Sequence, residues 1–346
     1  MKKIITITLC LLVSLCLSAC QNSVNEPETA PSETEAYTIG ICNYVDDASL
    51  NQIVNNITKQ LDTLTEGSNV TIEVLYDNAN ADANVMAQII SNFIAKEVDL
   101  MVGVATPVAL NMQAMTEDNQ IPVIFAAVSD PLSCGLVDSL DKPGHNISGT
   151  SDFLNTKNVL QLILQQNPEI KKAGLLYDAG QDASTKPVEE AKEFFAQNNI
   201  ECIEKTGTNV DEIKLAASAL IAEGVEAIFT PTDNTVMTAE LSIYEAIADA
   251  GILHYTGADS FALNGAFLGY GVDYANLGKE TADMIYEVLV NKADISSLNV
   301  KTFDNGTATI NTDIVEKLGL DLDTLKTQFE AFCTKIETIQ TAEEFE

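Results

Sequence analysis

The sequence contains no arginine: all 18 of its basic residues are lysines, against 51 acidic residues, and the formal net charge is -33. Binding to nucleic acid depends on basic side chains that neutralise phosphates, so this charge excludes nucleic acid as a partner. The lack of arginine also removes the planar guanidinium that commonly grips a carboxylate with two parallel hydrogen bonds. An anionic group of a ligand must therefore be held by hydroxyls and by backbone N–H groups at helix starts.

The motifs of common enzyme classes are absent as well. The chain lacks H-E-x-x-H, G-x-S-x-G, a P-loop and G-x-G-x-x-G, so no motif indicates a metalloprotease, a hydrolase or a nucleotide site. The two histidines, His145 and His254, lie far apart, and no cysteine pair has the C-x-x-C spacing of a zinc site. We therefore expect no metal, no cofactor and no catalytic residue. One disulfide stays possible among Cys42, Cys134, Cys202 and Cys333.

The first 20 residues have the pattern of an export signal. Lys2 and Lys3 precede an apolar stretch, residues 4–17, that is too short to span a bilayer comfortably. It ends in Leu17-Ser18-Ala19-Cys20, which looks like the lipobox at which bacterial lipoproteins are cleaved and acylated. We expect Cys20 to carry lipid; the alternative is an ordinary secretory signal with a chance cysteine. Residues 21–36 are polar, acidic and proline-containing, and are predicted to form a disordered linker.

After the linker, strand-like and helix-like segments alternate, and the alternation restarts halfway along the chain. With 346 residues, 46% of them hydrophobic, we expect two domains. Strand–helix alternation predicts parallel sheets covered by helices on both faces. Strands are predicted near residues 38–43, 71–76, 100–104, 122–127, 146–150, 173–177, 200–203, 227–230, 253–256 and 267–270. Helices are predicted near 50–65, 83–96, 108–117, 156–166, 188–198, 212–223, 236–250 and 277–291, followed by a hairpin around 304–306.

The two halves resemble each other in detail. Residues 94–107 (IAKEVDLMVGVATP) align with residues 221–234 (IAEGVEAIFTPTDN) at a constant offset, so that Thr106 corresponds to Asp233. In each half, polar and mostly acidic residues follow equivalent strands. An open parallel sheet binds ligands at the carboxyl ends of its strands. Two such domains that face each other would form a cleft lined from both sides.

Four stretches carry a family resemblance: residues 103–107 (GVATP), 125–137 (FAAVSDP, then GLV), 146–152 (NISGTSD) and 231–236 (PTDNTV). In this order, between about Tyr37 and Asn291, they resemble the ABC-transporter substrate-binding proteins of the tryptophan and aromatic amino-acid type. The resemblance implies an α/β fold of the periplasmic binding protein type I. Two Rossmann-like lobes with parallel sheets are then joined by a hinge and capture a small molecule for a membrane permease.

The resemblance also implies a division of the chain. We expect an N-terminal lobe at residues 37–152 with a crossover segment near 300–320, a C-terminal lobe at 153–299, and a helical tail at 321–346. One departure from the family is the loop after the first strand, Cys42–Asp47, where members often have glutamine or histidine. This loop lines the cleft in this fold, so its side chains bear on the identity of the ligand.

The polar binding residues are predicted where strands end. A ligand ammonium would be accepted by the carboxylate of Asp233, Asp259 or Asp273 through charge-assisted hydrogen bonds. A ligand carboxylate would be held by hydroxyls and by the positive ends of helix dipoles; the hydroxyls are those of Thr106, Ser151 and Thr232. For each polar residue taken alone, capping of the following helix is an equally good interpretation.

Aromatic side chains that follow predicted strand ends offer faces for the side chain of the ligand. The candidates are Tyr44, Tyr177, Tyr270 and Tyr274, and for each of them the alternative is packing in the core or at the rim. The complete predicted set of ligand-binding residues is Asn43, Tyr44, Ala105, Thr106, Ser129, Asp130, Ser151, Asp152, Tyr177, Thr232, Asp233, Asn234, Asp259, Tyr270 and Asp273.

These observations lead to a first hypothesis, a lipid-anchored receptor that captures an amino acid, with aromatic ones favoured, for the permease subunits of an ABC importer. The protein would be exported and held at the outer face of the cell membrane, or on the periplasmic side if the cell has two membranes. The alternative is a receptor of the same fold for a nucleoside, sugar or signalling molecule, used in uptake or sensing. Sugar-binding members of this fold often stack rings on tryptophan, and this chain has none. A third hypothesis, an extracellular enzyme, would use paired aspartates for acid–base work.

Overall fold

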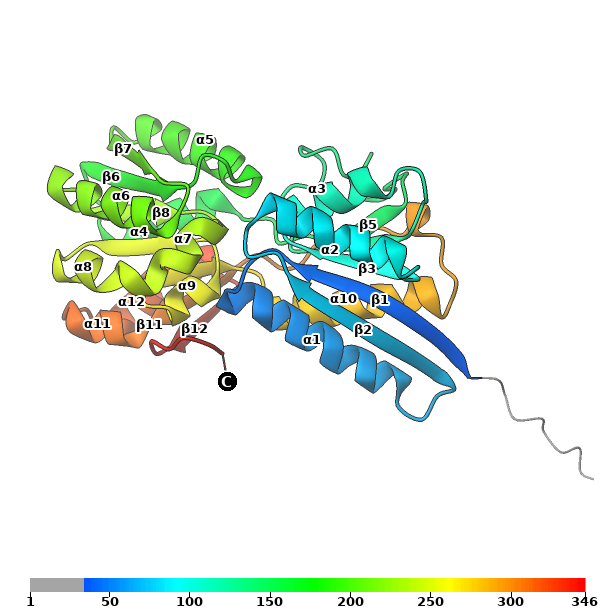
Figure 1. The fold of residues 1–346 in the computed structure, drawn as a ribbon. Helices are drawn as coiled ribbons and strands as arrows, with labels where there is room; N and C mark the ends of the chain where they lie inside the picture. Colours follow the sequence, from blue (N-terminus) through cyan, green and yellow to red (C-terminus); the bar gives the residue numbers. More distant parts are fainter. Residues whose placement is uncertain (1–33, 346) are drawn as a thin grey trace, which may run out of the picture. The chain divides into compact units, whose positions relative to one another are not determined.

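The computed structural model describes residues 34–345, and Figure 1 shows the fold. The predicted signal peptide, with its lipidation cysteine Cys20, lies outside the described residues, as does most of the predicted linker. The first strand begins at Glu35, so the last two residues of the predicted linker belong to a sheet. Within the described part of the chain the strands form two sheets, one of five strands and one of seven.

The first sheet is parallel throughout and is built from β1 (Glu35–Asn43), β2 (Val70–Asn78), β3 (Leu100–Val104), β4 (Val123–Ala126) and β5 (Ile147–Thr150). Its strands lie in the order β2-β1-β3-β4-β5. The register places Ile41 of β1 beside Val102 of β3, and Val102 beside Ile124 of β4. Every residue of β3, β4 and β5 is buried. Burial on both faces explains why β3 and β4 are almost entirely apolar in sequence. The two buried hydroxyls of β5, those of Ser148 and Thr150, are hydrogen bonded.

The second sheet is parallel except at one pairing and is built from β6 (Lys172–Tyr177), β7 (Glu201–Thr206), β8 (Ala227–Thr230), β9 (Leu253–Thr256), β10 (Leu268–Gly271), β11 (Thr307–Asn311) and β12 (Lys335–Ile339). Its strands lie in the order β12-β11-β10-β9-β8-β6-β7. β11 runs antiparallel to β10, and β12 runs parallel to β11. We call the first sheet with its helices the first lobe and the second sheet with its helices the second lobe.

Helices connect most of the strands and cover the sheets (Figure 1). α1 begins after Asp47, whose Oδ1 accepts a hydrogen bond from the N–H of Leu50 at 2.8 Å, which satisfies one of the free N–H groups of the first turn. Its apolar residues recur at helical spacing and are buried on one face. The helices are α1 (Ala48–Thr65), α2 (Ala83–Ala95), α3 (Thr106–Met115), α4 (Thr156–Gln166), α5 (Asp182–Gln197), α6 (Val210–Glu223), α7 (Asn234–Ala239), α8 (Tyr244–Asp249), α9 (Asp259–Leu263), α10 (Tyr274–Leu289), α11 (Thr312–Lys317) and α12 (Leu322–Phe329), with 3-10 turns η1 (Glu240–Ser242), η2 (Ile295–Ser297) and η3 (Glu330–Phe332).

The helix predicted at residues 236–250 is interrupted in the structure by the 3-10 turn η1. Glu240 of this turn is fully buried, and its Oε1 lies 3.0 Å from Nδ1 of His254 in β9. Nε2 of the same histidine lies 2.8 Å from the hydroxyl of Thr230. A buried carboxylate needs polar partners, and the change from α-helix to 3-10 turn occurs at the residue that makes this contact.

The chain crosses between the lobes several times, and two of the crossings differ from the prediction. α10 leaves β10 of the second sheet and packs on α1 and on the first sheet. Lys301 then lies beside β5, where its N–H donates to the carbonyl of Gly149 at 2.9 Å, and β11 returns to the second sheet. The predicted placement of residues 153–299 in one lobe and of 300–320 in the other is therefore wrong for these segments, because 274–289 pack on the first sheet and 307–311 pair in the second.

The C-terminal part also differs from its prediction. No hairpin forms around residues 304–306, because β11 pairs with β10 and with β12. The predicted helical tail, residues 321–346, contains α12 and η3 but also the strand β12. β12 is five residues long and only partly buried. It exists because β11 offers it an edge, a long-range partner that local sequence does not reveal.

Buried apolar side chains form a core in each lobe and a third cluster that joins the lobes. The shared cluster includes Ile39 and Ile53 of the first lobe together with Val236 and Phe261 of the second. The two lobes therefore bury apolar surface against each other in this conformation. Such contacts stabilise the arrangement in which the carboxyl ends of the two sheets face each other.

The contact between α10 and α1 depends on the absence of a side chain at Gly278. A Cβ atom at this position would lie 2.6 Å from the carbonyl oxygen of Ile53 and 2.9 Å from the Cβ of Asn56. We expect Gly278→Ala to lower the free energy of unfolding by about 1–3 kcal/mol because the helices must separate, although alanine is otherwise favoured over glycine inside helices by about 1 kcal/mol. Denaturant titration measures the change.

The matched control is Lys279→Ala at the next position of α10, which is exposed. A change within about 0.5 kcal/mol is expected there. A Gly278→Ala protein as stable as the parent, or more stable, would contradict the close packing of α10 on α1.

Candidate ligand-binding site

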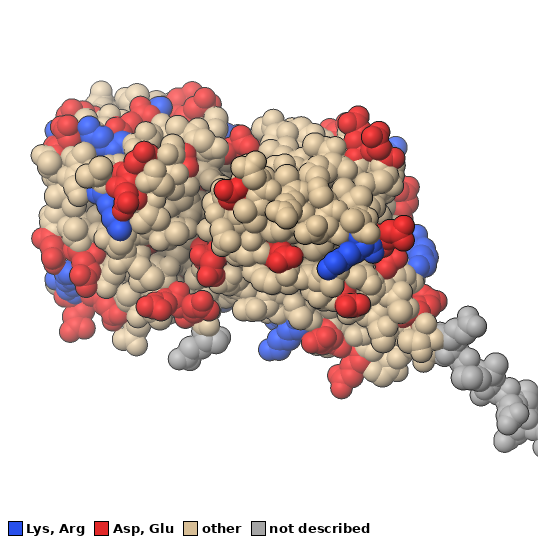
Figure 2. Space-filling model, in the orientation of Figure 1, with Lys and Arg blue, Asp and Glu red and all other residues tan. Residues whose placement is uncertain are grey.

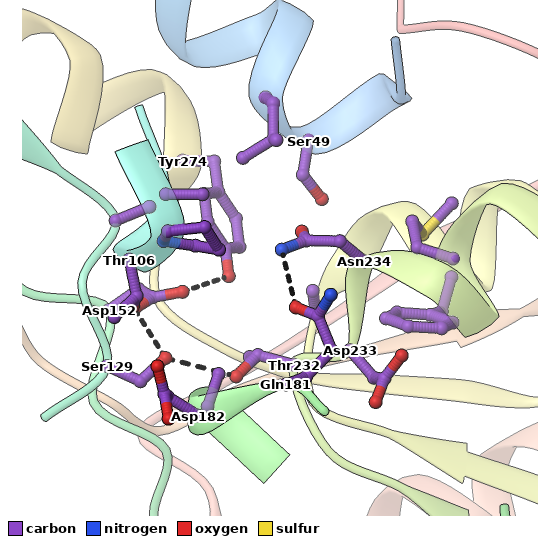
Figure 3. Close-up of a pocket in the computed structure, with 18 residues that line it drawn as sticks. Ser49, Thr106, Ser129, Asp152, Gln181, Asp182, Thr232, Asp233, Asn234 and Tyr274 are labelled. Atoms are coloured by element: carbon purple, nitrogen blue, oxygen red, sulfur yellow. Dashed lines mark hydrogen bonds between the residues drawn. The ribbon is translucent and has the colours of Figure 1, made fainter. Parts of the chain in front are cut away.

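A pocket lies between the two lobes, at the carboxyl ends of strands of both sheets (Figure 3). Its walls come from the segments that follow β3, β4 and β5 in the first lobe and β8 and β9 in the second. The first residues of several helices complete it. This is the edge at which open parallel sheets bind ligands, and each lobe contributes one wall.

Seven of the predicted binding residues line this pocket, and their contact with a ligand stays a prediction. Tyr274, one of the aromatic candidates, also lines it and is buried. In Figure 3 its hydroxyl points toward the carboxylate of Asp152. The seven residues are Ala105, Thr106, Ser129, Asp152, Thr232, Asp233 and Asn234.

Two alanines in the first-lobe wall have a positive φ. Ala105 follows β3 with φ 75° and ψ 157°, and Ala127 follows β4 with φ 55°. Such a backbone costs a residue other than glycine roughly 1–3 kcal/mol and persists where the surrounding structure requires one backbone conformation. Both residues line the pocket, and their methyl groups keep this wall free of bulky side chains.

Asp152 is a buried carboxylate of the pocket, and two hydroxyls fix its orientation. Ser129 Oγ donates to Oδ1 at 2.9 Å, and the Tyr274 hydroxyl donates to Oδ2 at 3.0 Å. Burial raises the pKa of the Asp152 carboxyl, while these two hydrogen bonds act in the opposite direction. Each oxygen can accept at least one further hydrogen bond, so Asp152 presents an oriented acceptor to the pocket.

Asp233 also lines the pocket, but its carboxylate is engaged within the second lobe. Oδ1 accepts the N–H groups of Thr235 and Val236 at 3.1 and 3.0 Å. Oδ2 accepts the N–H of Asp178 at 2.8 Å and the hydroxyl of Ser184 at 2.6 Å. Burial raises the pKa of Asp233 to about 6 against the effect of these donors. This geometry fits the capping alternative and leaves Asp152 better placed than Asp233 to receive an ammonium group.

The helix starts around the pocket differ in how their N–H groups are satisfied. α1, α7 and α10 are capped by the side chains of Asp47, Asp233 and Asp273. α3 starts after Ala105 and α5 after Gln181, and neither has a side-chain cap. Uncapped N–H groups and the positive end of the helix dipole favour an anion. The first residue of α5 is Asp182, whose carboxylate lines the pocket, so the start of α3 is the part of the wall best suited to a carboxylate.

Polar contacts join the two walls across the pocket. The hydroxyl of Ser129 lies 3.2 Å from that of Thr232, as Figure 3 shows, and the hydroxyls of Ser49 and Ser260 are hydrogen bonded. The free volume enclosed is about 30 Å³, which is room for one or two water molecules. The lobes must therefore move apart for a molecule as large as an amino acid to enter.

Three predicted residues lie behind the walls of the pocket. The side-chain nitrogen of Asn43 donates to Oδ1 of Asn51 at 3.3 Å. The hydroxyl of Tyr44 accepts from Nε2 of Gln181 at 3.4 Å, and Ser151 Oγ donates to a backbone carbonyl of the adjacent loop at 3.3 Å. These contacts position wall segments, and none of the three side chains lines the pocket.

Three predicted aspartates also lie outside the pocket. Asp130 is at its rim and pairs with Lys186. Asp259 begins α9; burial raises its pKa to about 7, and its Oδ1 has no hydrogen-bond partner within the described residues. Asp273 is exposed and accepts the N–H of Asn276 at 2.9 Å as the cap of α10.

Tyr177 and Tyr270 face away from the pocket, as the packing alternative expects. The hydroxyl of Tyr177 donates to the carboxylate of Glu204 at 2.8 Å. Tyr270 is completely buried, and its hydroxyl donates to the carbonyl of Phe332 at 2.7 Å. Both side chains therefore belong to the interior or edge of the second lobe.

Other residues of the pocket were not predicted from the sequence. The residues at the starts of α1 and α5 follow the ends of β1 and β6. Binding residues were predicted at the ends of other strands, and the same reasoning applied to β1 and β6 would have found these residues. The apolar ones in α7 and α9 carry no local signal, because apolar residues in helical segments are usually core. The unpredicted lining residues are Ser49, Leu50, Pro107, Ala127, Gln181, Asp182, Ala183, Met237, Ala258 and Phe261.

The surface charge, the cysteines and the remaining polar side chains of the described residues indicate no second kind of site. On the face drawn in Figure 2, acidic side chains outnumber lysines, which do not gather into a basic patch. Within residues 34–345, no cluster of three or more histidine, cysteine or acidic side chains is arranged to hold a metal ion. The four cysteines in this range are free thiols. None of the helices in these residues has both the length and the apolar character needed to span a membrane.

Two α/β lobes with a pocket between the carboxyl ends of their sheets define a solute-binding protein of the type I periplasmic class, as predicted. The family model described as "ABC transporter substrate binding protein" matches residues 38–327. The chain belongs to this family. Its members bind solutes for transport, so the protein is a binding protein and the enzyme hypothesis falls.

Individual relatives agree with this assignment. The "Tyrosine-binding protein" of Clostridioides difficile (strain R20291) is 30% identical over 301 residues, which cover 86% of this chain and 85% of that protein. A structure in complex with L-Trp from Streptococcus pneumoniae is 27% identical, with a TM-score of 0.77 over 87% of this chain and 100% of that one. The ligand-free, open structure of a substrate-binding protein with adhesive properties from Clostridium difficile is 28% identical, with a TM-score of 0.66 over 88% of this chain and 100% of that one.

Buried carboxyls near the pocket predict that stability depends on pH. Burial raises the pKa of Asp47 to about 7, that of Asp233 to about 6 and that of Asp259 to about 7, whereas an unfolded aspartate titrates near about 3.9. The folded state therefore binds more protons than the unfolded state, and stability is lost as pH rises through this window. We expect the free energy of unfolding to be lower at pH 8 than at pH 5 by roughly 1–3 kcal/mol per carboxyl, measured by denaturant titration.

Asp259→Asn tests the cause, because the amide keeps the shape of the side chain and removes its charge. This variant should show a smaller loss between pH 5 and pH 8 than the parent. The control is Asp294→Asn, an exposed residue whose pKa is held below its usual value by the hydroxyl and N–H of Ser296, and it should leave the loss unchanged. Equal stability of the parent at both pH values would contradict the prediction.

Proposed function

We propose that the protein captures an aromatic amino acid as a zwitterion between its lobes and delivers it to the permease of an ABC importer. One observation carries the proposal: the pocket combines an oriented carboxylate, Asp152, with uncapped helix starts and two aromatic side chains. The tyrosine-binding relative from Clostridioides difficile and the tryptophan complex from Streptococcus pneumoniae support the same class of ligand.

The ammonium of the ligand binds to Asp152 in this proposal. The hydroxyls of Ser129 and Tyr274 already orient both carboxylate oxygens. An ammonium group adds a charge-assisted hydrogen bond in a site shielded from water, where such bonds are strong. Binding a cation also compensates the burial that raises the pKa of this carboxyl.

The carboxylate of the ligand binds to the uncapped start of α3. Ala105 gives this helix no side-chain cap. Thr106 lines the pocket, and its hydroxyl adds a hydrogen-bond donor for the carboxylate. Among the described residues that line the pocket there is no lysine, and the chain has no arginine. Backbone N–H groups and the helix dipole therefore supply the positive potential that a carboxylate needs.

The aromatic ring of the ligand packs against Tyr274 and Phe261. Both line the pocket and both are almost completely buried. Leu50 and Met237 add apolar surface from opposite lobes. Aromatic pairs stabilise each other beyond their buried area when they meet at an offset or edge to face. A ligand that touches both lobes favours the closed form by contacts that the open form cannot make.

The conformation of the lobes in this structure fits the closed form of the protein, which binds the ligand in this proposal. Its TM-score is 0.77 with the tryptophan complex and 0.66 with the ligand-free, open protein of similar identity. The pocket is too small to admit an amino acid without movement. The lobes therefore open to admit the ligand, and closure gives the permease a surface that reports occupancy.

Outside the described residues, the chain is proposed to be a lipoprotein. The N-terminal 20 residues direct export, Cys20 receives the lipid, and residues 21–33 tether the folded part to the outer side of the membrane. A substrate-binding protein of an ABC importer works on the outer side, next to its permease, so the anchor keeps the receptor close to the partner it serves.

Asp152→Asn tests the ammonium site. Against a panel of tyrosine, tryptophan, phenylalanine, other amino acids, nucleosides and sugars, isothermal titration calorimetry of the parent should show binding of one or more aromatic amino acids. The substitution removes the charge but keeps partners for the Ser129 and Tyr274 hydroxyls, so affinity should fall by about ten-fold or more with little loss of stability.

Asp321→Asn is the matched control, since Asp321 caps α12 in the second lobe and is exposed. Its affinity should equal that of the parent. Binding of a nucleoside or sugar without any aromatic amino acid would overturn the proposed ligand class, and an unchanged affinity of Asp152→Asn would overturn the role of Asp152.

Cys20→Ser tests the anchor. Without the thiol no lipid can be attached, and the protein should move from the membrane fraction to the aqueous fraction when cells are separated, because the acyl chains supply the membrane affinity. Cys202→Ser, a substitution in β7, should remain with the membrane. Retention of the Cys20→Ser protein in the membrane fraction would contradict the proposal.

A further inference from the structure

An ion pair bridges the two lobes at the rim of the pocket. Nζ of Lys186, in α5 of the second lobe, lies 3.1 Å from Oδ2 of Asp130, in the loop after β4 of the first lobe. We propose that this pair is a latch: it stabilises the closed arrangement of the lobes and so slows the release of ligand that it does not itself contact. The effect on release rests on the proposed function, whereas the effect on closure does not.

The acidic half of the latch is held in place within its own lobe. Oδ1 of Asp130 accepts the N–H of Ser133 at 3.0 Å, and Oδ2 accepts the hydroxyl of Ser133 at 2.7 Å. Partial burial alone would raise the pKa of Asp130, but these donors and the Lys186 ammonium outweigh it and hold the pKa below its ordinary value. The carboxylate is therefore charged and oriented before the lobes meet.

The basic half is placed by an aromatic ring. Nζ of Lys186 lies 5.7 Å from the centroid of the Phe153 ring, within the range of a cation–π interaction. Phe153 directly follows the segment that leaves β5 toward the second lobe. Asp182 and Glu190 line the same hollow as Lys186, so the ammonium lies among acidic groups from both lobes. Removing its charge leaves carboxylates facing each other across the rim, and their repulsion favours opening.

The latch lies outside the ligand pocket. Lys186 and Asp130 do not line it, while Asp182 and Ala183, one turn earlier in α5, do. Opening the lobes separates Nζ from Oδ2 completely, because the two residues are on different lobes. A substitution at Lys186 should therefore change the balance between open and closed forms without removing a contact to the ligand.

The first experiment uses ligand-free protein and small-angle X-ray scattering. Lys186→Met should have a larger radius of gyration than the parent at 20 mM NaCl. Raising NaCl to 500 mM screens both the ion pair of the parent and the repulsion between carboxylates in the variant. The parent should therefore expand, the variant should contract, and the difference between their radii of gyration should shrink. Lys192→Met is the matched control: Lys192 is on the same helix but pairs with Glu204 inside the second lobe, and it should scatter like the parent.

The charge reversal Asp130→Lys with Lys186→Asp restores the pair with exchanged signs. The radius of gyration of the double variant should be closer to that of the parent than the radius of either single reversal is. If the two side chains had only separate structural roles, the double variant would not recover in this way. Identical scattering of Lys186→Met and the parent at both salt concentrations would overturn the latch. Failure of the double reversal to recover any closure, with each single reversal folded by circular dichroism, would overturn it as well.

The second experiment measures ligand release with L-tyrosine and L-tryptophan as probes. In stopped-flow displacement, release from Lys186→Met should be about two- to five-fold faster than from the parent, the range expected for one solvent-exposed ion pair, with association changed less. Equal release rates would overturn the effect of the latch on ligand retention. If none of the proteins binds either probe, while Lys186→Met still scatters as the more open form, then the proposed ligand class fails and the latch stands.

Discussion

Backbone N–H groups at helix starts are the interaction on which this site depends. Every helix leaves such groups unsatisfied in its first turn, and parallel strands deliver several of these turns to one edge of each sheet. The protein caps some with its own aspartates, at α1, α7 and α10, and leaves α3 and α5 without a side-chain cap. In a chain without arginine, this division separates the turns that hold the fold together from those that can hold an anion.

The alternating strands and helices could be predicted from the sequence because buried parallel strands and amphipathic helices leave strong periodic patterns. The helix of α10 was also predicted, but the lobe in which α10 and β11 lie could not be, because their packing partners are distant in sequence. α10 is an ordinary amphipathic helix that is equally suited to either lobe, and its place beside α1 depends on the fit at Gly278. β12 is short and only partly buried, so its strand state comes from the edge that β11 provides.

The predicted binding residues gather only in part around one pocket, and their contact with a ligand stays a prediction. Strand ends located the pocket, since Thr106, Ser129, Asp152 and Thr232 all line it. Residue type alone could not distinguish an aspartate that caps a helix from one that is free to accept a hydrogen bond from a ligand. Asp233 and Asp152 both follow strands, but the carboxylate of Asp233 is occupied by donors from the Asp178–Ser184 segment. The carboxylate of Asp152 is only oriented by two hydroxyls. Tyr270 shows the same limit, because only its contact with Phe332 reveals that it faces the interior.

The interleaving of the lobes along the chain bears on biosynthesis. The first sheet is complete at Thr150, yet the helix that covers it beside α1 ends only at Leu289. A ribosome must therefore translate five of the seven strands of the second sheet before the first lobe can close over its own core. Cutting the gene after Thr150 would leave one fragment with a first sheet that lacks α10 and another fragment with α10 but without the sheet on which it packs, so no single cut separates the two lobes.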